Sequence, residues 1–334
     1  MDINMNTDLK SPEIIRSFII PVLDFSPHSP YNINTLLKDL EDIAGEVICV
    51  FNSFEVFDKL HNHPRIDKYC FNNLNAGVSR SWSIGINLAE GKYVFILNAD
   101  VHILPSAIYE LQSYLLSLDN AVIAGPQGAI VDYQKLIDAK SFHKGNFDEP
   151  VQVHAVSGFF FAIHLERYLR HHLLFDVQFS PCFYEEWDMG LQIMHAGLAC
   201  YVVPVKDFEH QWGASHDKHL SVNYFGREMS RKDILNGNRE HFVSKWHHAY
   251  SPEKSTRLDQ SKVEKLEGFL ERIKKETYPE PQHDLHTNIT KNSLDMFLDK
   301  YSLPEDAKVL DVGCGQGVAL ELFKSKGLHS IGVT

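Results

Sequence analysis

The chain has 334 residues, which at about 150 residues per domain predicts two domains, or one large domain with an attachment. Hydrophobic residues make up 44% and charged residues 23%, a composition that excludes disordered and collagen-like chains. The 44 acidic residues exceed the 32 basic ones and leave a formal net charge of −12, which argues against nucleic acid as a partner.

The first 125 residues alternate short apolar runs with segments whose apolar residues have helical spacing. The predicted strands are 17–23, 46–51, 68–71, 92–97 and 121–125. We expect Asn32 to cap the helix after the first strand, and Pro105 to occupy the first turn of a later helix. Strands that recur about every 25 residues, with helices between them, indicate right-handed βα units and a mostly parallel central sheet.

The rest of the chain changes in composition twice. Residues 126–250 are less regular and hold a predicted helix over 188–196 and a predicted strand over 199–203. In 251–283, 14 of 33 residues are charged and the apolar ones form one helical stripe, which favours a helical linker. The predicted parts are a domain over 1–250, a charged helical linker over 251–284, and the incomplete start of another domain over 285–334.

Asp100 is the first candidate functional residue. It follows the strand 92–97, and ligands of parallel α/β sheets bind just beyond the carboxyl ends of strands. It lies too early to cap the helix that begins at Pro105, so we favour a functional role over a structural one. A carboxylate there suits a divalent cation, Mn²⁺ or Mg²⁺, held against a pyrophosphate.

The segment 184–188 (YEEWD) is the second candidate. Crowding of its three carboxylates raises the pKa of at least one of them, which suits a general base. An acidic helix N-terminus, favoured by the helix dipole, explains the same spacing equally well. His210 follows, and a single histidine is by itself more often a surface or core residue than a ligand.

Six segments, in order across about 230 residues, resemble the family 2 glycosyltransferases of the GT-A, nucleotide-diphospho-sugar transferase fold. The similar segments are 19–24 (IIPVLD), 75–100 (NAGVSRSWSIGINLAEGKYVFILNAD), 156–163 (VSGFFFAI), 183–198 (FYEEWDMGLQIMHAGL), 210–215 (HQWGAS) and 238–246 (NREHFVSKW). The resemblance implies a mostly parallel α/β sheet flanked by helices.

The resemblance also implies roles for matching residues. Those implied to bind the nucleotide-sugar are Pro21, Asp24, Asn52, Ser53, Asn75, Arg80, Asn98, Asp100 and Gly158. Those implied to hold the metal are Asp100, His210, Asn98 and His102, of which Asn98 and Asp100 match a DxD-like motif. Glu186 matches the catalytic base, with Glu185 as the competing candidate. The expected acceptor-side residues are Trp187, Asp188 and Trp212.

The implied function is a metal-dependent, inverting glycosyltransferase. It would move a sugar from a nucleotide-sugar to a hydroxyl of a glycan or lipid-linked glycan, as in the biosynthesis of a surface polysaccharide, lipopolysaccharide or capsule. Five residues depart from the family pattern. Asn98 replaces the first aspartate of DxD, Glu186 replaces an aspartate, and Asn52 stands where an aspartate is common. Ser83 stands where an asparagine commonly precedes Ile-Gly, and Asp24 where asparagine is frequent. These departures leave the donor sugar and nucleotide open.

A second resemblance lies at the end of the chain. Residues 309–317 (VLDVGCGQG) look like motif I of class I S-adenosylmethionine methyltransferases, in which a strand runs into a glycine-rich turn. The matching residues are Asp311, Gly313, Gly315 and Gly317. Only about one βαβ unit follows, so we expect S-adenosylmethionine as a cofactor only of a longer, bifunctional parent; a vestigial domain is the alternative.

Two other functions and the location of the protein complete the expectations. The chain could be a non-catalytic sugar-nucleotide or glycan-binding module with a degenerate site, or a methyltransferase whose N-terminal part positions the substrate. The five cysteines are odd in number and form no CxxC pair, which favours a reducing compartment. With no apolar run near the roughly 18 residues of a spanning helix, we expect a cytoplasmic protein, with contact to the inner face of the membrane only through its acceptor.

Overall fold

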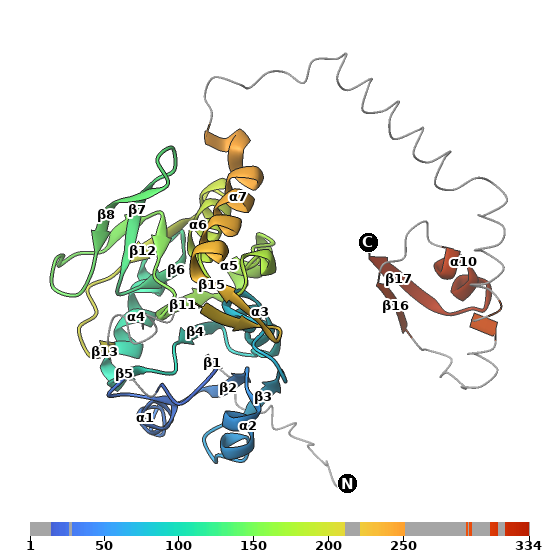
Figure 1. Ribbon diagram of the computed structural model, residues 1–334, viewed down its shortest axis with the longest axis horizontal. Coiled ribbons are helices and arrows are strands. Elements are labelled where there is room, and N and C mark those ends of the chain that lie inside the picture. Colours follow the sequence, from blue (N-terminus) through green and yellow to red (C-terminus); the bar gives the residue numbers. More distant parts are fainter. Residues whose placement is uncertain are drawn as a thin grey trace, which may run out of the picture. The chain divides into compact units, whose positions relative to one another are not determined.

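The computed structural model describes residues 15–26, 29–210, 221–250, 292, 294–295, 308–312 and 318–333. The chain divides into two compact units, residues 1–252 and 253–334 (Figure 1). Among the residues in these described ranges, no helix has the length and apolar character needed to cross a membrane. The predicted linker over 251–284 lies outside the described residues.

The first unit is built on one eight-stranded sheet. In spatial order its strands are β3 (Lys68–Phe71), β2 (Glu46–Phe51), β1 (Arg16–Val22), β4 (Tyr93–Leu97), β11 (Phe160–His164), β6 (Ala121–Gly125), β12 (Ala199–Val202) and β9 (Val151–Val153). Only β11 and β9 run antiparallel to their neighbours, so the sheet is mostly parallel, as the strand spacing predicted.

Helices cover both faces of this sheet (Figure 1). They are α1 (Ile33–Asp39), α2 (Phe54–Leu60), α3 (Val78–Leu88), α4 (Pro105–Ser117), α5 (Leu165–Arg170), the short 3₁₀ helix η1 (Val177–Phe179), α6 (Glu185–His195) and α7 (Arg231–Tyr250). Asn32 caps α1 by accepting from the Asn34 amide at 3.0 Å, and Pro105 starts α4. Both predictions about these two helix starts are confirmed.

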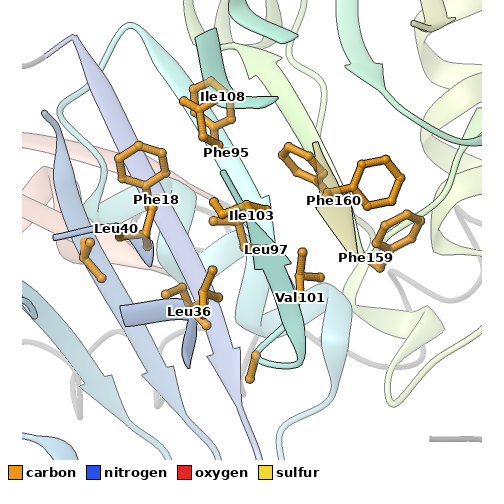
Figure 2. Packing of buried hydrophobic residues seen from close by; sticks show 14 of the residues in the cluster. Phe18, Leu36, Leu40, Phe95, Leu97, Val101, Ile103, Ile108, Phe159 and Phe160 are labelled. Carbon is orange, nitrogen blue, oxygen red and sulfur yellow. The ribbon is translucent and has the colours of Figure 1, made fainter. Parts of the chain in front are cut away.

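Two apolar cores follow from the two-residue alternation of strand side chains. Phe18 and Phe95, on neighbouring strands, point into the core shared with α1 and α4, where Leu36 and Ile108 are buried (Figure 2). The alternate residues of the same strands, such as Ile19 and Ile96, face the core on the other side of the sheet. There they lie in one cluster with Trp82 of α3 and Ile193 of α6. Because the central strands are buried on both faces, they read as continuous apolar runs.

Helix α6 begins three residues before the predicted start at 188. Phe183 and Tyr184 adopt positive φ angles of 82° and 76°, and this turn directs the chain into the helix at Glu185. Non-glycine residues rarely adopt such angles, because these angles cost conformational free energy. Residues with such backbone strain are common at functional sites. The acidic cluster therefore forms the first turn of the helix.

Three small sheets in the first unit were not predicted. They comprise β5 (Val101–Ile103) with β13 (Phe208–His210), β10 (Ala155–Val156) with the hairpin β7 (Gly128–Asp132) and β8 (Ile137–Phe142), and the hairpin β14 (Ser221–Tyr224) with β15 (Arg227–Ser230). Most are two to five residues long, too short for a clear alternation of apolar and polar residues. They surround the carboxyl ends of the large sheet.

The second unit contains β16 (Lys308–Val312), α10 (Val318–Ser325) and β17 (His329–Val333), with the two strands parallel. This is one βαβ unit, and its first strand lies where a strand was predicted. Asp311 is on β16, whereas Gly313, Gly315 and Gly317 of the predicted S-adenosylmethionine motif lie outside the described residues.

Candidate functional site

The site forms where the strand order of the large sheet reverses direction. Strands β1, β2 and β3 extend to one side, and β4 lies on the other side of β1. The pairing of β1 with β4 ends at Ile19–Ile96, whereas its pairing with β2 continues to Val22–Phe51. Pro21, which has no amide hydrogen, lies in the part of β1 beyond its pairing with β4. Such a topological switch point is where open α/β sheets bind ligands.

A cleft of about 600 Å³ lies on the β4 side of this point. Its walls come from the residues after β4, the β7–β8 hairpin, the segment 155–159, the start of α6, and β13. Six predicted site residues line it together: Asn98, Gly158, Glu185, Glu186, Trp187 and His210. The cleft thus joins segments that are more than 100 residues apart in the sequence.

Glu186 is fixed against the segment before β11. Its Oε1 accepts a hydrogen bond from the amide of Gly158 at 3.1 Å. A Cβ atom at Gly158 would lie 2.7 Å from that same oxygen and 2.6 Å from the Trp82 ring. Position 158 therefore requires glycine for this close approach.

The two neighbouring glutamates differ in their environment. Burial raises the pKa of the Glu186 carboxyl, while the Gly158 amide opposes this shift. Burial and the charge of Glu186 raise the pKa of Glu185 well above its ordinary value. Glu185 is only 5% exposed, and its Oε2 makes no hydrogen bond in the described part of the chain. Of the two carboxyls, Glu185 therefore has the stronger tendency to keep its proton.

His210 lines the cleft and contacts Asp100, which is not itself one of the lining residues. The Asp100 Oδ1 and His210 Nε2 atoms are 3.5 Å apart, and their side chains are only 13% and 11% exposed. The antiparallel pairing of β5 with β13 brings them together, with His210 opposite Val101. The His210 ring also stacks on Phe159, with centroids 4.4 Å apart. The structure thus brings two of the predicted metal ligands together.

The other predicted metal ligands are placed differently. Asn98 lines the cleft, and its backbone amide donates to the Phe159 carbonyl at 2.8 Å. His102 instead bonds to Asp39 at 2.8 Å and stacks on Tyr31. Across the described ranges, no three His, Cys, Asp or Glu side chains are grouped so that they could hold a metal. A cation here would take two or three protein ligands and complete its shell with other oxygens.

Asn52, predicted to contact the nucleotide, is a buried structural residue. Its amide donates to Ser81 Oγ at 2.9 Å, and its Oδ1 accepts from the Ala76 amide at 3.1 Å. These bonds join the end of β2 to the loop before α3. The neighbouring Ser53 caps α2 through the Val56 amide.

Asn75 and Arg80 lie at the N-terminal end of α3, beneath the β14–β15 hairpin. Asn75 Nδ2 donates to the Asn223 carbonyl at 2.8 Å, and the Asn75 carbonyl accepts from the Phe225 amide at 3.1 Å. The Arg80 guanidinium lies 5.6 Å from the centre of the Phe225 ring. Its Nε is buried and makes no hydrogen bond in the part of the chain that the structure describes.

The comparisons with known proteins agree with this geometry. Residues 37–170 match the family model described as Glycosyl transferase family 2. That segment runs from α1 to α5 and includes Asn98, Asp100 and Gly158. The chain contains a glycosyltransferase domain. A comparison with curated proteins found no match.

Solved structures resemble the chain in fold. The crystal structure of GalNAc-T7 with UDP, GalNAc and Mn²⁺ has 14% sequence identity and a TM-score of 0.50, covering 76% of this chain and 54% of that one. The crystal structure of S. aureus TarS has 13% identity and a TM-score of 0.43, covering 58% of this chain and 36% of that one. That of S. aureus TarS 1-349 in complex with UDP has 14% identity and a TM-score of 0.43, covering 58% and 59%. The chain thus spans about half of GalNAc-T7, and the predicted glycosyltransferase fold is confirmed.

Two other predicted residues of the glycosyltransferase domain lie outside the cleft lining. Asp188, expected on the acceptor side, is wholly buried and bonds to Lys245 at 2.8 Å and to Trp246 at 2.7 Å, both on α7. Asp24 follows β1 and accepts from the Ser26 amide at 2.7 Å. Trp212, the remaining acceptor-side residue, lies outside the described residues.

Sequence reasoning missed the contribution of the β7–β8 hairpin to the glycosyltransferase cleft. Gln127, Asp138 and Ser141, within or beside this hairpin, line the cleft. Burial raises the pKa of the Asp138 carboxyl, and the Trp187 side chain opposes this shift. Asp138 belongs to no motif, so only its place opposite α6 reveals it.

Proposed function

We propose that the protein transfers a sugar from a nucleotide-sugar to an acceptor hydroxyl with inversion at the anomeric carbon. The observation that carries the proposal is the cleft lined by both Glu186 and His210, since His210 in turn lies 3.5 Å from Asp100. A carboxylate base and a site for the leaving diphosphate are the two parts that this reaction needs.

The donor would bind across the carboxyl ends of β1 and β4. Asp100, His210 and Asn98 are the residues that would hold Mn²⁺ or Mg²⁺, and their oxygen and imidazole donors suit these ions. GalNAc-T7, which shares the fold, was solved with UDP and Mn²⁺, which supports this assignment. When bound, the cation would offset the charge that grows on the departing diphosphate. Arg80, whose Nε makes no hydrogen bond in the described ranges, would contact the same group.

Glu186 would act as the base, rather than Glu185. The Gly158 amide favours the ionised form of Glu186, whereas the buried Glu185 keeps its proton. The Glu186 carboxylate would take the proton of the acceptor hydroxyl as that oxygen forms its bond to the anomeric carbon. The bond from the anomeric carbon to the diphosphate breaks on the opposite face, which inverts the configuration.

The acceptor would be a hydroxyl of a glycan or glycoconjugate, as in the synthesis of a surface polysaccharide. We place this activity in the cytoplasm, because the described cysteines Cys49, Cys70, Cys182 and Cys200 are free thiols. We also propose that the βαβ unit of β16, α10 and β17 begins a methyltransferase domain in a bifunctional protein. Its parallel strand pairing and the glycine-rich sequence between β16 and α10 support this.

The first test is a panel of UDP-, GDP-, dTDP- and CMP-sugars, each with and without Mn²⁺, read by thermal shift and by donor hydrolysis. We expect one donor class to stabilise the protein in a metal-dependent way. The Asp100→Ala variant should lose this effect, and Asp42→Ala, which removes an exposed carboxylate after α1, should keep it. If no donor raises the melting temperature with any metal, a non-catalytic binding module becomes the better description.

A further inference from the structure

The β7–β8 hairpin forms the wall of the cleft that faces the start of α6. Asp138, on β8, lies opposite Val131 of β7 in the hairpin register and lines the cleft. Trp187, one residue after the proposed base, lines the same cleft, and its side chain lowers the pKa of the Asp138 carboxyl, which burial raises. Asp138 and the first turn of α6 therefore line the same cleft.

Trp187 is itself held in place by other aromatic rings. Tyr133 and Tyr184 approach it edge to face, with ring centroids 6.2 and 5.3 Å away, and Phe242 of α7 lies 6.0 Å away. This packing fixes the Trp187 indole in the cleft wall, which Asp138 also lines.

The charge of the cleft is uneven. Asp138, Glu185 and Glu186 all line it, whereas no lysine or arginine is found among its lining residues in the described chain. Asp138 raises the pKa of Glu186 through its charge, which shows that the two carboxylates interact electrostatically. The buried Glu185 carboxyl also lines the cleft, and its Oε2 has no hydrogen-bond partner in these ranges.

We propose that Asp138, with Trp187 in the same cleft wall, binds the acceptor and makes the site selective for uncharged sugars over anionic ones. This inference rests on the proposed function, since it assigns the acceptor side of the same cleft. A carboxylate beside an aromatic ring suits a neutral sugar, because the carboxylate accepts from hydroxyl groups while the ring covers apolar CH groups.

An anionic sugar would meet the opposite situation. Its carboxylate or phosphate would lie near the carboxylates of Asp138 and Glu186, with no basic side chain of the described lining to neutralise it. Like charges that lie close together repel strongly where water is partly excluded. Asp138 lies at the exposed rim of the cleft. Replacing it with a neutral residue of similar size therefore weakens this repulsion without leaving a cavity in the apolar core.

Binding can be tested without knowing the donor. Saturation-transfer NMR of the full chain would compare methyl β-glucoside with methyl β-glucuronide, and methyl β-galactoside with its uronide. Each pair differs only in the group at C6. We expect the neutral sugars to bind and the uronides to bind at least about fivefold more weakly, and Asp138→Asn to remove most of this difference. Asp132→Asn, in the same hairpin but outside the lining, is the matched control and should behave as wild type.

Uronides that bind as well as neutral sugars, an unchanged ratio in Asp138→Asn, or no binding of any glycoside would overturn the inference. A failure of the proposed function looks different: charge-selective binding would persist while no nucleotide-sugar is consumed. Once a donor is found, Asp138→Asn should raise the acceptor KM more than it lowers kcat.

The same variant should also move the acid limb of the pH profile to lower pH. The titratable groups around Glu186 are Glu185 on α6, Asp138 on β8, Cys182 before α6 and His210 across the cleft. The charge of Arg231, on α7, acts on the Cys182 thiol. Among these groups, the Asp138→Asn variant changes only Asp138. It removes one negative charge near Glu186, which lowers the pKa of Glu186. A purely structural role for Asp138 would leave this limb unmoved.

Discussion

At the scale of single residues, the proposed chemistry depends on the difference between two adjacent glutamates. Glu186 has an amide donor and an open cleft, whereas Glu185 is buried with one oxygen that makes no hydrogen bond in the described chain. The spacing YEEWD could not distinguish them, because their difference comes from Gly158, 28 residues earlier. The same contact explains why position 158 must be glycine.

Replacing the two glutamates separately should give different kinetics. Glu186→Gln is expected to lower kcat by about 100-fold or more, because a general base contributes about 10²–10⁴ in rate. Donor affinity should remain, since the amide of glutamine still accepts from Gly158. Glu185→Gln, which resembles the protonated form that the raised pKa of Glu185 favours, should keep most of kcat. The check is initial-rate kinetics with the donor found in the panel, and equal losses in both variants would contradict the assignment.

Glu185 should also affect stability in a pH-dependent way. Its folded-state pKa lies above the unfolded value, so the folded state binds more protons and stability falls as pH rises through this range. Glutamine cannot ionise, and Glu185→Gln is therefore expected to raise the melting temperature by ~2–4 °C near pH 8. The gain should vanish near pH 4, where both states are protonated. Calorimetry at the two pH values checks this, with Glu166→Gln, an exposed glutamate on α5, as control.

At the scale of elements, α7 anchors the acidic first turn of α6 (Figure 1). Lys245 bridges Asp176 and Asp188, each at 2.8 Å, and Trp246 donates to Asp188 at 2.7 Å. Asn238 donates to the carbonyls of Phe179 and Cys182, in the loop before α6. These bonds give the acidic turn a fixed position relative to the cleft.

The elements also show which features of the site a single sequence can predict and which it cannot. The strand ends predicted the positions of Asn98 and Asp100, because polar residues directly after apolar runs must lie at the edge of a parallel sheet. Asp188 was predicted on the acceptor side, and its bond to Lys245 joins residues 57 apart on two helices whose packing no local pattern encodes. Asp138 was missed for the same reason, since a six-residue strand of exposed residues has no apolar alternation.

Removing Lys245 should therefore cost more than a surface ion pair does. Lys245→Met would leave the buried Asp188 without its cation, and we expect a loss of about 2 kcal/mol in unfolding free energy, less than for a fully buried pair. Adding Asp188→Asn should recover part of it, because the uncompensated charge is gone. Urea denaturation of the wild type and of the single and double variants measures this coupling. Simple additivity of the two losses would show that the pair does not act as a unit.

At the scale of the whole molecule, every described residue of the proposed donor, base and acceptor sites lies in the unit of residues 1–252. The second unit contributes a βαβ element with its own strand pairing. The two units are therefore expected to carry separate activities, with the sugar transfer complete in the first. This expectation is independent of whether the second unit methylates a substrate.

A chain ending at residue 252 tests this division. We expect it to keep the metal-dependent stabilisation by the donor, and a kcat within about threefold of the full chain, because α7 and its anchoring bonds are retained. Asp100→Ala in the shortened chain should again abolish donor binding, which separates a folded, active unit from residual background. If the shortened chain stays folded by circular dichroism but loses turnover, residues 253–334 must supply part of the site. The acceptor would then be bound by both units, and the single-unit mechanism proposed here would have to be replaced.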